Sequence, residues 1–341
     1  MVPVFSSGPT AKALRYMRGA AGLRSSILSF VVCLIFSLPN PVAARVEIAA
    51  EIMPLAERSV LLDVTLAGDR LVAVGERGHV LLSDDFGETW KQTAVSTRST
   101  LTAVFFADAQ RGWAVGHDNV ILATADGGVS WSHQYAEGGI ENRFLDVYFL
   151  DDGRGFAVGA YGLFVETVDG GARWTSREIY WEELHFNRIS MAADGRLFIA
   201  METGELLQSV DDGGTWEEMD SPYDGSLFGV LSLGARTLVA YGLRGNVFRS
   251  SDGGESWVVV ETPAPLLVTH GIRLAGGEVV LAAQNGRFFL SRDGGRSFTV
   301  WQVPVQGAAA LTEAPDGSVV AVGLNGVWRL QVPRREGRRE G

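Results

Sequence analysis

Short apolar runs rich in β-branched residues alternate with glycine-rich turns along most of this chain. Runs of this length, bounded by turn residues, predict β-strands rather than helices. One stretch shows four of them in succession, at Leu101–Phe106, Gly112–Val115, Val120–Thr124 and Trp131–Gln134. We therefore expect a repeating unit of four short antiparallel strands, named A to D in chain order.

An eight-residue motif connects strands C and D of each unit, with the form Ser/Thr-x-Asp-x-Gly-x-Ser/Thr-Trp. The third unit has Arg173 at the seventh position, and the last copy ends in Phe298. The terminal aromatic residues of the copies are 41 to 43 residues apart. A period near 42 with several strands per period is typical of a propeller or a repeat array. The six copies span residues 83–90, 124–131, 167–174, 209–216, 250–257 and 291–298.

The chemistry of this motif, the Asp box, predicts a structural turn. Its carboxylate accepts hydrogen bonds from backbone N–H groups two residues further on, and its glycine adopts a positive φ. Its aromatic ring is expected in the apolar layer between strands. Six catalytic carboxylates at equal spacing make no chemical sense, so we interpret the boxes as scaffold. The box residues in question are Asp85, Asp126, Asp169, Asp211, Asp252 and Asp293, with Trp90, Trp131, Trp174, Trp216, Trp257 and Phe298.

A second repeated feature is a tight turn between strands B and C, of the form Gly-x-x-Gly or a close variant. Seven such turns begin at residues 75, 116, 159, 201, 242, 283 and 323, against six boxes. The seventh unit therefore lacks its fourth strand, and Arg45–Ile52 is the expected substitute. The prediction is an all-β, seven-bladed β-propeller closed by this N-terminal strand, with six or eight blades as alternatives. The expected blades are 61–93, 101–134, 144–177, 187–218, 228–260, 270–301 and 308–330.

The N-terminus has the pattern of a secretory signal. Four basic residues occur before residue 25, an apolar run follows at Ile27–Leu38, and Val42–Ala44 offers small residues for cleavage. We expect a signal peptide at 1–44, a propeller at 45–332 and a disordered tail at 333–341. A retained membrane anchor is the alternative for the first segment. The only cysteine, Cys33, lies in that run, so the mature chain has no disulfide. These features predict the periplasm or another exported compartment.

The charge balance restricts the partners. The formal net charge is −11, and cleavage would remove four basic residues and no acid, leaving −15. Such a chain is a poor partner for nucleic acid. We expect a soluble monomer after cleavage.

Strand order assigns two faces to the ring. The boxes and the A–B loops share one face, and the B–C turns and the D–A connectors share the other, on which propellers commonly bind ligands. The long connector Ile179–Phe186 is rich in aromatic residues. It is either a partner-binding patch or a plug between the third and fourth blades. The turn tips form a polar ring around a central channel, which is either a solvated rim or a binding site for a small ligand or a peptide. The candidate partner-binding residues are Arg77, His117, Tyr161, Tyr180, Trp181, His185, Phe186 and Arg244.

Enzymatic function is disfavoured. Sialidases share Asp-box propellers, but their Phe/Tyr-Arg-Ile-Pro motif is absent from the sequence. Glu182 and Glu183 are adjacent, so on a strand they would point apart. The five histidines have no metal-ligand spacing. We therefore expect no catalytic residues, no metal and no cofactor, and keep a sialidase-like glycosidase or a lectin using the central channel as the alternative.

Several motifs together resemble a known family. They are blade openings such as Leu101–Phe106 and Phe144–Phe149, the segments Gly112–Gly116 and Gly155–Gly159, and boxes of the form Asp-Gly-Gly-x-Ser-Trp. This combination resembles the photosystem II stability and assembly factors, which are seven-bladed Asp-box (BNR-like) propellers. The resemblance implies an exported, non-catalytic scaffold or assembly factor for a membrane-protein complex. It also implies an arginine-rich surface that engages the client, for which Arg77 and Arg244 hold equivalent turn tips.

Overall fold

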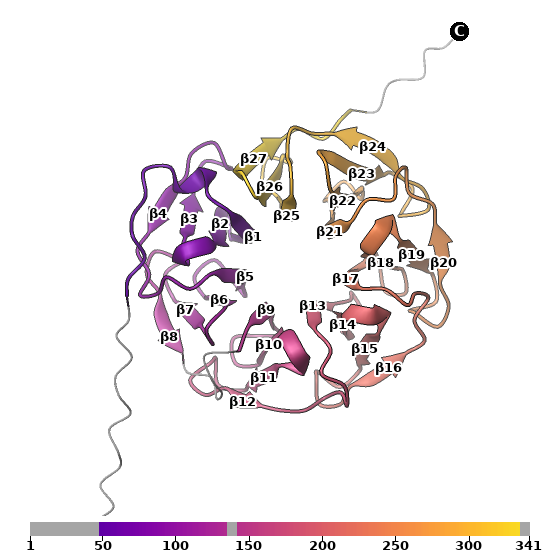
Figure 1. Cartoon of the computed structure of the whole chain (residues 1–341), viewed down its shortest axis with the longest axis horizontal. Helices are drawn as coiled ribbons and strands as arrows, with labels where there is room; N and C mark the ends of the chain where they lie inside the picture. The colour runs from indigo at the N-terminus through magenta and orange to yellow at the C-terminus, as the bar shows by residue number, and fades with distance from the viewer. Residues whose placement is uncertain (1–47, 135–141, 335–341) are drawn as a thin grey trace, which may run out of the picture. The chain divides into compact units, whose positions relative to one another are not determined.

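A computed structural model describes residues 48–134 and 142–334. In this part of the chain, seven antiparallel sheets are arranged as blades around a central channel (Figure 1). The first six sheets have four strands and the last has three. The predicted seven-bladed propeller is therefore confirmed.

The strands follow the chain from blade to blade, with strand A innermost. Blades 1 to 4 comprise β1 (Leu61–Ala67), β2 (Arg70–Gly75), β3 (Val80–Ser83), β4 (Lys91–Thr93); β5 (Leu101–Phe106), β6 (Gly112–Gly116), β7 (Ile121–Thr124), β8 (Ser132–Gln134); β9 (Phe144–Phe149), β10 (Gly155–Gly159), β11 (Phe164–Thr167), β12 (Thr175–Ser176); and β13 (Phe186–Met191), β14 (Leu197–Met201), β15 (Leu206–Ser209), β16 (Glu217–Met219). Blades 5 to 7 comprise β17 (Leu227–Ser232), β18 (Leu238–Gly242), β19 (Val247–Ser250), β20 (Val258–Val260); β21 (Val268–Arg273), β22 (Val279–Ala283), β23 (Arg287–Ser291), β24 (Thr299–Gln302); and β25 (Ala308–Glu313), β26 (Val319–Gly323), β27 (Gly326–Leu330).

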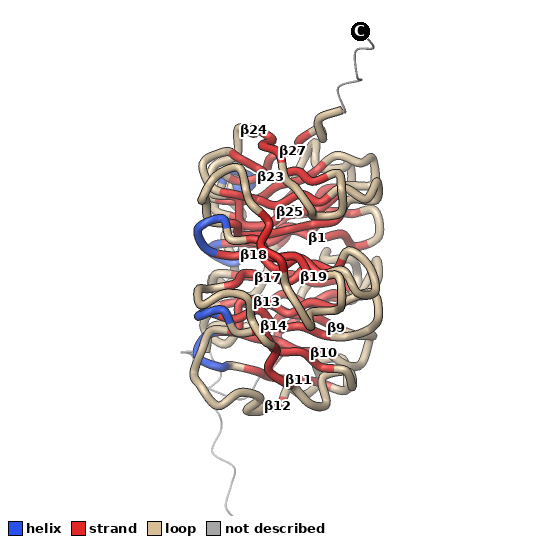
Figure 2. Tube along the Cα trace, turned by 90° about the vertical axis from the view of Figure 1, so that its right-hand side faces the viewer, coloured by secondary structure: helices blue, strands red, loops and turns tan. Residues whose placement is uncertain are grey.

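Short 3-10 turns occupy one face of the ring. They are η1 (Ala56–Arg58), η2 (Glu76–Gly78), η3 (Ala160–Gly162), η4 (Glu202–Gly204) and η5 (Leu243–Gly245). Four of them are B–C turns, whereas the boxes connect the opposite ends of strands C and D. Figure 2 shows the 3-10 turns gathered on one side of the ring. We call this side the turn face and the other the box face. Among the described residues, none forms a helix with the length and hydropathy needed to span a bilayer.

The core lies between blades rather than inside each one. Strand B is buried along nearly its whole length in every blade, because apolar side chains leave both faces of its sheet. One cluster packs Val72 and Val74 of blade 1 against Val104 and Ala114 of blade 2. Continuous apolar runs, rather than alternating ones, are the expected sequence of such doubly covered strands.

The Asp boxes are closed by the same hydrogen bonds, except that Arg173 in the third box supplies only its backbone N–H and no hydroxyl. In the box of blade 4, Ser209 Oγ accepts from Gly213 N (2.9 Å) and donates to Asp211 Oδ1 (2.8 Å). Asp211 also accepts from Thr215 N (2.8 Å) and Thr215 Oγ1 (2.9 Å). The backbone donor is thus four residues after the aspartate, where we expected two, because the carboxylate spans the whole turn. Trp174 and Phe298 are buried, and the other four box aromatics are half-buried.

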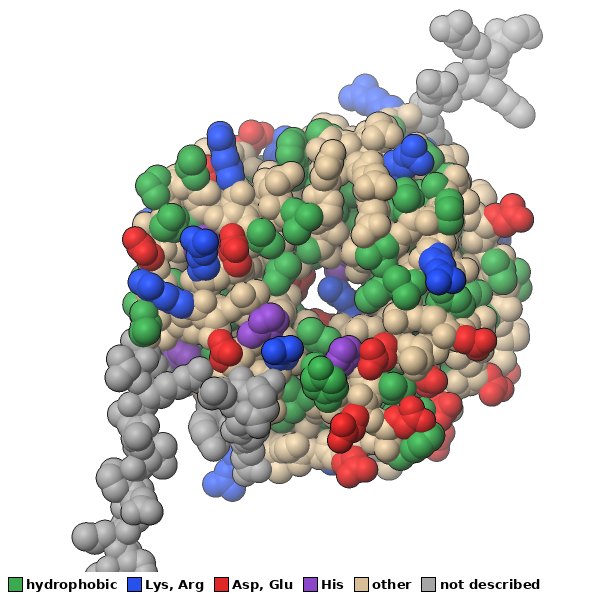
Figure 3. Space-filling model, in the orientation of Figure 1, with side chains coloured by type: hydrophobic (Ala, Val, Ile, Leu, Met, Phe, Trp, Pro, Cys, Tyr) green, Lys and Arg blue, Asp and Glu red, His purple; other side chains and the backbone are tan. Residues whose placement is uncertain are grey.

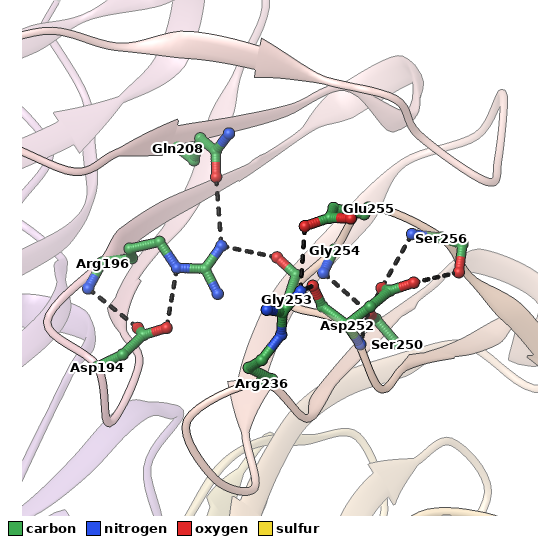
Figure 4. Close-up of polar contacts among 10 residues, drawn as sticks. All are labelled: Asp194, Arg196, Gln208, Arg236, Ser250, Asp252, Gly253, Gly254, Glu255 and Ser256. Atoms are coloured by element: carbon green, nitrogen blue, oxygen red, sulfur yellow. Dashed lines mark hydrogen bonds and ion pairs between the residues drawn. The ribbon is translucent and has the colours of Figure 1, made fainter.

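The boxes also join neighbouring blades. Figure 4 shows Arg196 of blade 4 donating through Nη1 to the carbonyl of Gly253 in the next box (2.7 Å) while Asp194 holds its Nε (3.0 Å). A side chain of the preceding blade binds a carbonyl of every box, so the box is an inter-blade clamp as well as a turn. The donor–acceptor pairs are Arg329–Phe86, Arg70–Gly127, Trp113–Gly170 with Gln134–Gly170, Arg177–Gly213, Arg196–Gly253 and Arg249–Gly294.

The predicted closure of the ring by an N-terminal strand is wrong for the residues that the structure describes. Residues 48–52 contain no strand, and the seventh sheet keeps three strands. Ala50 instead donates its N–H to Val95 O (2.8 Å), because its small side chain fits the core between blades 1 and 2. The ring closes through Arg329 of β27, which binds Phe86 O (3.1 Å) and Glu88 Oε1 (3.0 Å) of blade 1.

Residues 45–47 of the proposed strand, the predicted signal peptide at 1–44 and the tail from residue 335 onward lie outside the described residues. Pro333, also assigned to the tail, accepts a hydrogen bond from Arg292 through its carbonyl.

Candidate functional site

The tips of the B–C turns project from the turn face in an unusual backbone conformation. Arg77, Tyr161 and Arg244 have φ values of 56°, 58° and 58°. A positive φ is uncommon outside glycine and costs a side-chain-bearing residue about 1–2 kcal/mol. The flanking strands B and C impose it, and the three side chains are exposed. The fold thus holds non-glycine side chains on this rim at a conformational cost.

A chain of contacts links two adjacent turns with the connector between blades 3 and 4. The ring of Tyr161 lies 4.9 Å from that of His185, edge to face. Glu202 of η4 accepts a hydrogen bond from the His185 backbone N–H (2.8 Å) and pairs with its Nδ1 (3.1 Å). Glu202 therefore positions His185, and His185 supports the exposed Tyr161.

Beyond His185, the connector covers an open groove against the outer strands of blade 4. The groove has a volume of about 590 Å³ and is lined by Glu178, Ile179, Tyr180, Trp181, Leu207, Trp216 and Glu218. Trp181 is 75% exposed and its ring lies 5.9 Å from that of Tyr180. Tyr180 donates weakly to Glu218 Oε2 (3.4 Å). We call this feature the aromatic groove.

The electrostatics of the aromatic groove are acidic. Partial burial, together with the nearby carboxylates of Glu218, Glu205 and Glu182, raises the pKa of Tyr180 to about 12. In Figure 3, acidic side chains gather beside hydrophobic ones over blades 3 and 4 on this face. Such a surface favours cationic and apolar groups of a partner.

The structure separates the other predicted site residues. Phe186 was expected to contact a partner, but it is fully buried in β13 within the core between blades 3 and 4. Its contribution is packing, as the plug interpretation of the connector requires. Arg77, His117 and Arg244 belong to blades 1, 2 and 5, so they do not join the aromatic groove of blades 3 and 4.

A second candidate site lies in the central channel, and the sequence analysis missed the residues that form it. The third residue of strand A is Asp63, Asp146, Arg188 and His270 in blades 1, 3, 4 and 6, and these side chains line the channel. The same position is occupied by Ala103, Gly229 and Ala310 in blades 2, 5 and 7. These four polar residues line a cavity of about 200 Å³. Basic, acidic and histidine side chains are visible in the central opening in Figure 3. Aligning the seven A strands would have revealed this set.

Three of these polar residues fasten one blade to the next. Asp63 Oδ2 accepts from Val104 N (2.9 Å), and Asp146 Oδ2 accepts from Ile189 N (2.9 Å). His270 Nδ1 accepts from Leu311 N (3.3 Å). In every case the donor is the backbone N–H of the fourth residue in strand A of the next blade. This residue lies close to the β-bulge in the pairing of that strand with strand B.

Burial controls the charges in the channel. It raises the pKa of Asp63 to about 6, although Arg188 opposes the change. It also raises the pKa of Asp146 and lowers that of His270 well below its usual range, so His270 is neutral. Burial alone would lower the pKa of Arg188, but Asp146, Tyr241 and Asp63 outweigh it. Among the described residues, the cavity is thus lined by one arginine and two aspartates.

Neither site resembles a glycosidase centre. The box aspartates bond within their own loops, and the channel offers a single arginine from the described residues, where a sialidase uses several. Among residues 48–134 and 142–334, no three His, Cys, Asp or Glu side chains come together as a metal site.

Comparison with known proteins agrees with this architecture. Solved structures similar to the chain include YCF48 bound to D1 peptide, at 18% identity and a TM-score of 0.68, covering 84% of this chain and 94% of that one. YCF48 from Cyanidioschyzon merolae is similar at 19% identity and a TM-score of 0.66, covering 81% and 97%. A streptogramin B lyase shares the fold at 13% identity and a TM-score of 0.69, covering 81% and 95%.

A search of curated proteins finds no match to the sequence. The sequence model described as "Photosynthesis system II assembly factor YCF48" matches residues 82–139 and 133–309, which together make up more than half of the chain. The protein therefore belongs to the YCF48 photosystem II assembly factor family.

Proposed function

We propose that this protein is an exported, non-catalytic assembly or stability factor that binds a segment of a membrane protein at the aromatic groove on the turn face. Family membership supports the assembly role. A structure of a similar propeller carries a D1 peptide, so a peptide of D1 type is the first partner to test. The apolar run and cleavage pattern of residues 1–44 support export, and we expect a monomer.

The observation that carries this proposal is the exposure of Trp181. An indole that is 75% exposed leaves a large apolar surface in water. Trp and Tyr are enriched among the residues that dominate protein–protein binding energy. Tyr180 lies beside Trp181, and Tyr161 is 63% exposed on the neighbouring turn. Trp181 is therefore part of a larger aromatic surface and not a single exposed side chain.

The chemistry of the groove defines the partner segment. Its floor includes Leu207 and Trp216, and its rim includes Glu178 and Glu218. A complementary peptide carries apolar side chains for the floor and Lys or Arg for the rim. The acidic net charge of the chain adds long-range attraction for such a segment.

Site-specific photocrosslinking tests the location. A photoreactive amino acid at Tyr161 should crosslink a membrane protein in intact cells. The matched controls are Val168 and Val210, which are 77% and 72% exposed in box loops on the opposite face. We expect a specific adduct from position 161 and none from the controls. Equal adducts from both faces, or none from position 161, would contradict the proposal.

A further inference from the structure

The central channel contains a charged side chain that the fold does not need. Two blades place Ala103 or Ala310 at the equivalent position of strand A, so a propeller of this sequence closes without a polar group there. Asp63, Asp146 and His270 are accounted for by their bonds to the next blade. Arg188 is not, because it forms no hydrogen bond or ion pair within 4.0 Å with the residues that the structure describes.

The surroundings of Arg188 point to a ligand with two opposite charges. Its guanidinium offers five N–H donors that match a carboxylate. Asp63 and Asp146 influence it electrostatically from beyond ion-pair distance and bring two negative charges to the same cavity. A simple anion would meet these carboxylates, and a simple cation would meet Arg188. A zwitterion satisfies both.

The carboxylates still have acceptor capacity for a cation. Asp63 accepts one backbone N–H on each oxygen, from Val64 and Val104, both at 2.9 Å. Each carboxylate oxygen has two lone pairs, so one remains on both atoms. A ligand ammonium group placed there can donate hydrogen bonds to the remaining lone pairs of these oxygens.

The volume and the lining residues of the cavity restrict the size and the polarity of the ligand's side chain. A volume of about 200 Å³ is below the range of about 300–1,000 Å³ typical of drug-sized ligand sites. Phe105 and Tyr148 form an aromatic wall, with ring centroids 4.9 Å apart, and Val147 and Leu311 add apolar surface. The space suits one small molecule with an apolar side chain.

We propose that the central channel binds a free α-amino acid with an apolar side chain, its carboxylate on Arg188 and its ammonium group between Asp63 and Asp146. A longer peptide separates its two charged termini and does not place both in this cavity. The site is independent of the aromatic groove, which belongs to the turn face and the outer strands of blade 4.

Isothermal titration calorimetry on the purified propeller tests this assignment. The probes are the apolar and aromatic α-amino acids, with N-acetylphenylalanine and phenethylamine as analogues that lack one charge. We expect at least one amino acid to bind and each singly charged analogue to bind at least about tenfold more weakly. Absence of heat for all the amino acids at millimolar concentration, or equal affinity for an analogue, overturns the proposal.

Two variants locate the site. Arg188→Gln should abolish binding, while Arg244→Gln, which changes an exposed arginine on the turn face, should leave it unchanged. Wild-type affinity in a folded Arg188→Gln protein overturns the assignment. If circular dichroism shows that this variant does not fold, Thr65→Phe replaces it as the test variant. It fills the channel with a larger side chain, keeps every charge and should abolish amino-acid binding. Binding retained by Thr65→Phe contradicts the proposal, and if neither variant folds the analogue series on the wild type is decisive.

Discussion

The two faces of the ring are built by opposite strategies. On the box face, six copies of one motif share the hydrogen bond from the glycine N–H to the Ser or Thr hydroxyl, and a side chain of the preceding blade binds a carbonyl of each box. On the turn face, the tip residue varies between blades, as in Arg77, Tyr161 and Thr203, on a similar backbone. Repetition of identical chemistry marks the scaffold. Function is expected where the repeat is broken, at the aromatic groove and in the channel.

The largest expected difference in stability is between substitutions of two tryptophans, one buried and one exposed. Trp174 is fully buried, packs edge-to-face on Phe149 at 5.7 Å and donates to Gln134 Oε1 (3.1 Å). Trp174→Ala should lower the free energy of unfolding by about 3–5 kcal/mol, because it leaves a cavity in the core. Trp181→Ala should change it by less than about 0.5 kcal/mol. Urea denaturation measures both, and equal losses would remove the distinction between scaffold and surface.

A smaller effect is expected from a single inter-blade clamp. Arg196→Ala removes the bonds to Gly253 O and Asp194, and should cost about 1–2 kcal/mol because the carbonyl loses a charged donor. Arg244→Ala on the turn face is the matched control and should be neutral. An unchanged Arg196→Ala protein would mean that the boxes fasten only their own blade.

The contribution of the box aspartates to stability and that of the channel residue Asp63 are expected to change with pH in opposite directions. Hydrogen bonds from Thr89 and Thr215 lower the pKa of Asp85 and Asp211 to about 2, below the ordinary value of about 3.9. Their stabilisation is complete above about pH 4 and is lost as the pH falls through 2. Burial raises the pKa of Asp63 to about 6, so its contribution is most favourable below about pH 4 and declines as the pH rises through 6.

The corresponding measurement is urea denaturation at pH 8, 5 and 2.5. As the pH rises from 5 to 8, ionisation of Asp63 should lower the free energy of unfolding of the wild type by about 1–3 kcal/mol. The Asp63→Asn variant should not show this decrease. Both proteins should lose stability at pH 2.5 as the boxes protonate. A wild type whose stability does not decrease between pH 5 and 8 relative to the variant would show that Asp63 is not buried as described.

The sequence predicts the repeated parts of the molecule because they recur with a fixed spacing. The box aspartates such as Asp211, the B–C turns and the order of the strands all follow from that period. It does not predict the clamps, since Arg70 and Gly127 are far apart in sequence and meet only through blade packing. It also misplaces Phe186, whose neighbours Tyr180 and Trp181 are partly or largely exposed while it points into the core. The channel set was missed because Asp63, Asp146 and Arg188 come from three different blades.

The most direct test of the central claim is affinity capture from detergent-solubilised membranes with three versions of the propeller. The wild type should retain a membrane protein, Trp181→Ala should retain at least about tenfold less because it removes the main exposed anchor, and Val168→Ala on the box face should match the wild type. Folding of each protein is verified by its urea midpoint. Capture that is lost with Val168→Ala and kept with Trp181→Ala would contradict the assignment of function to the turn face.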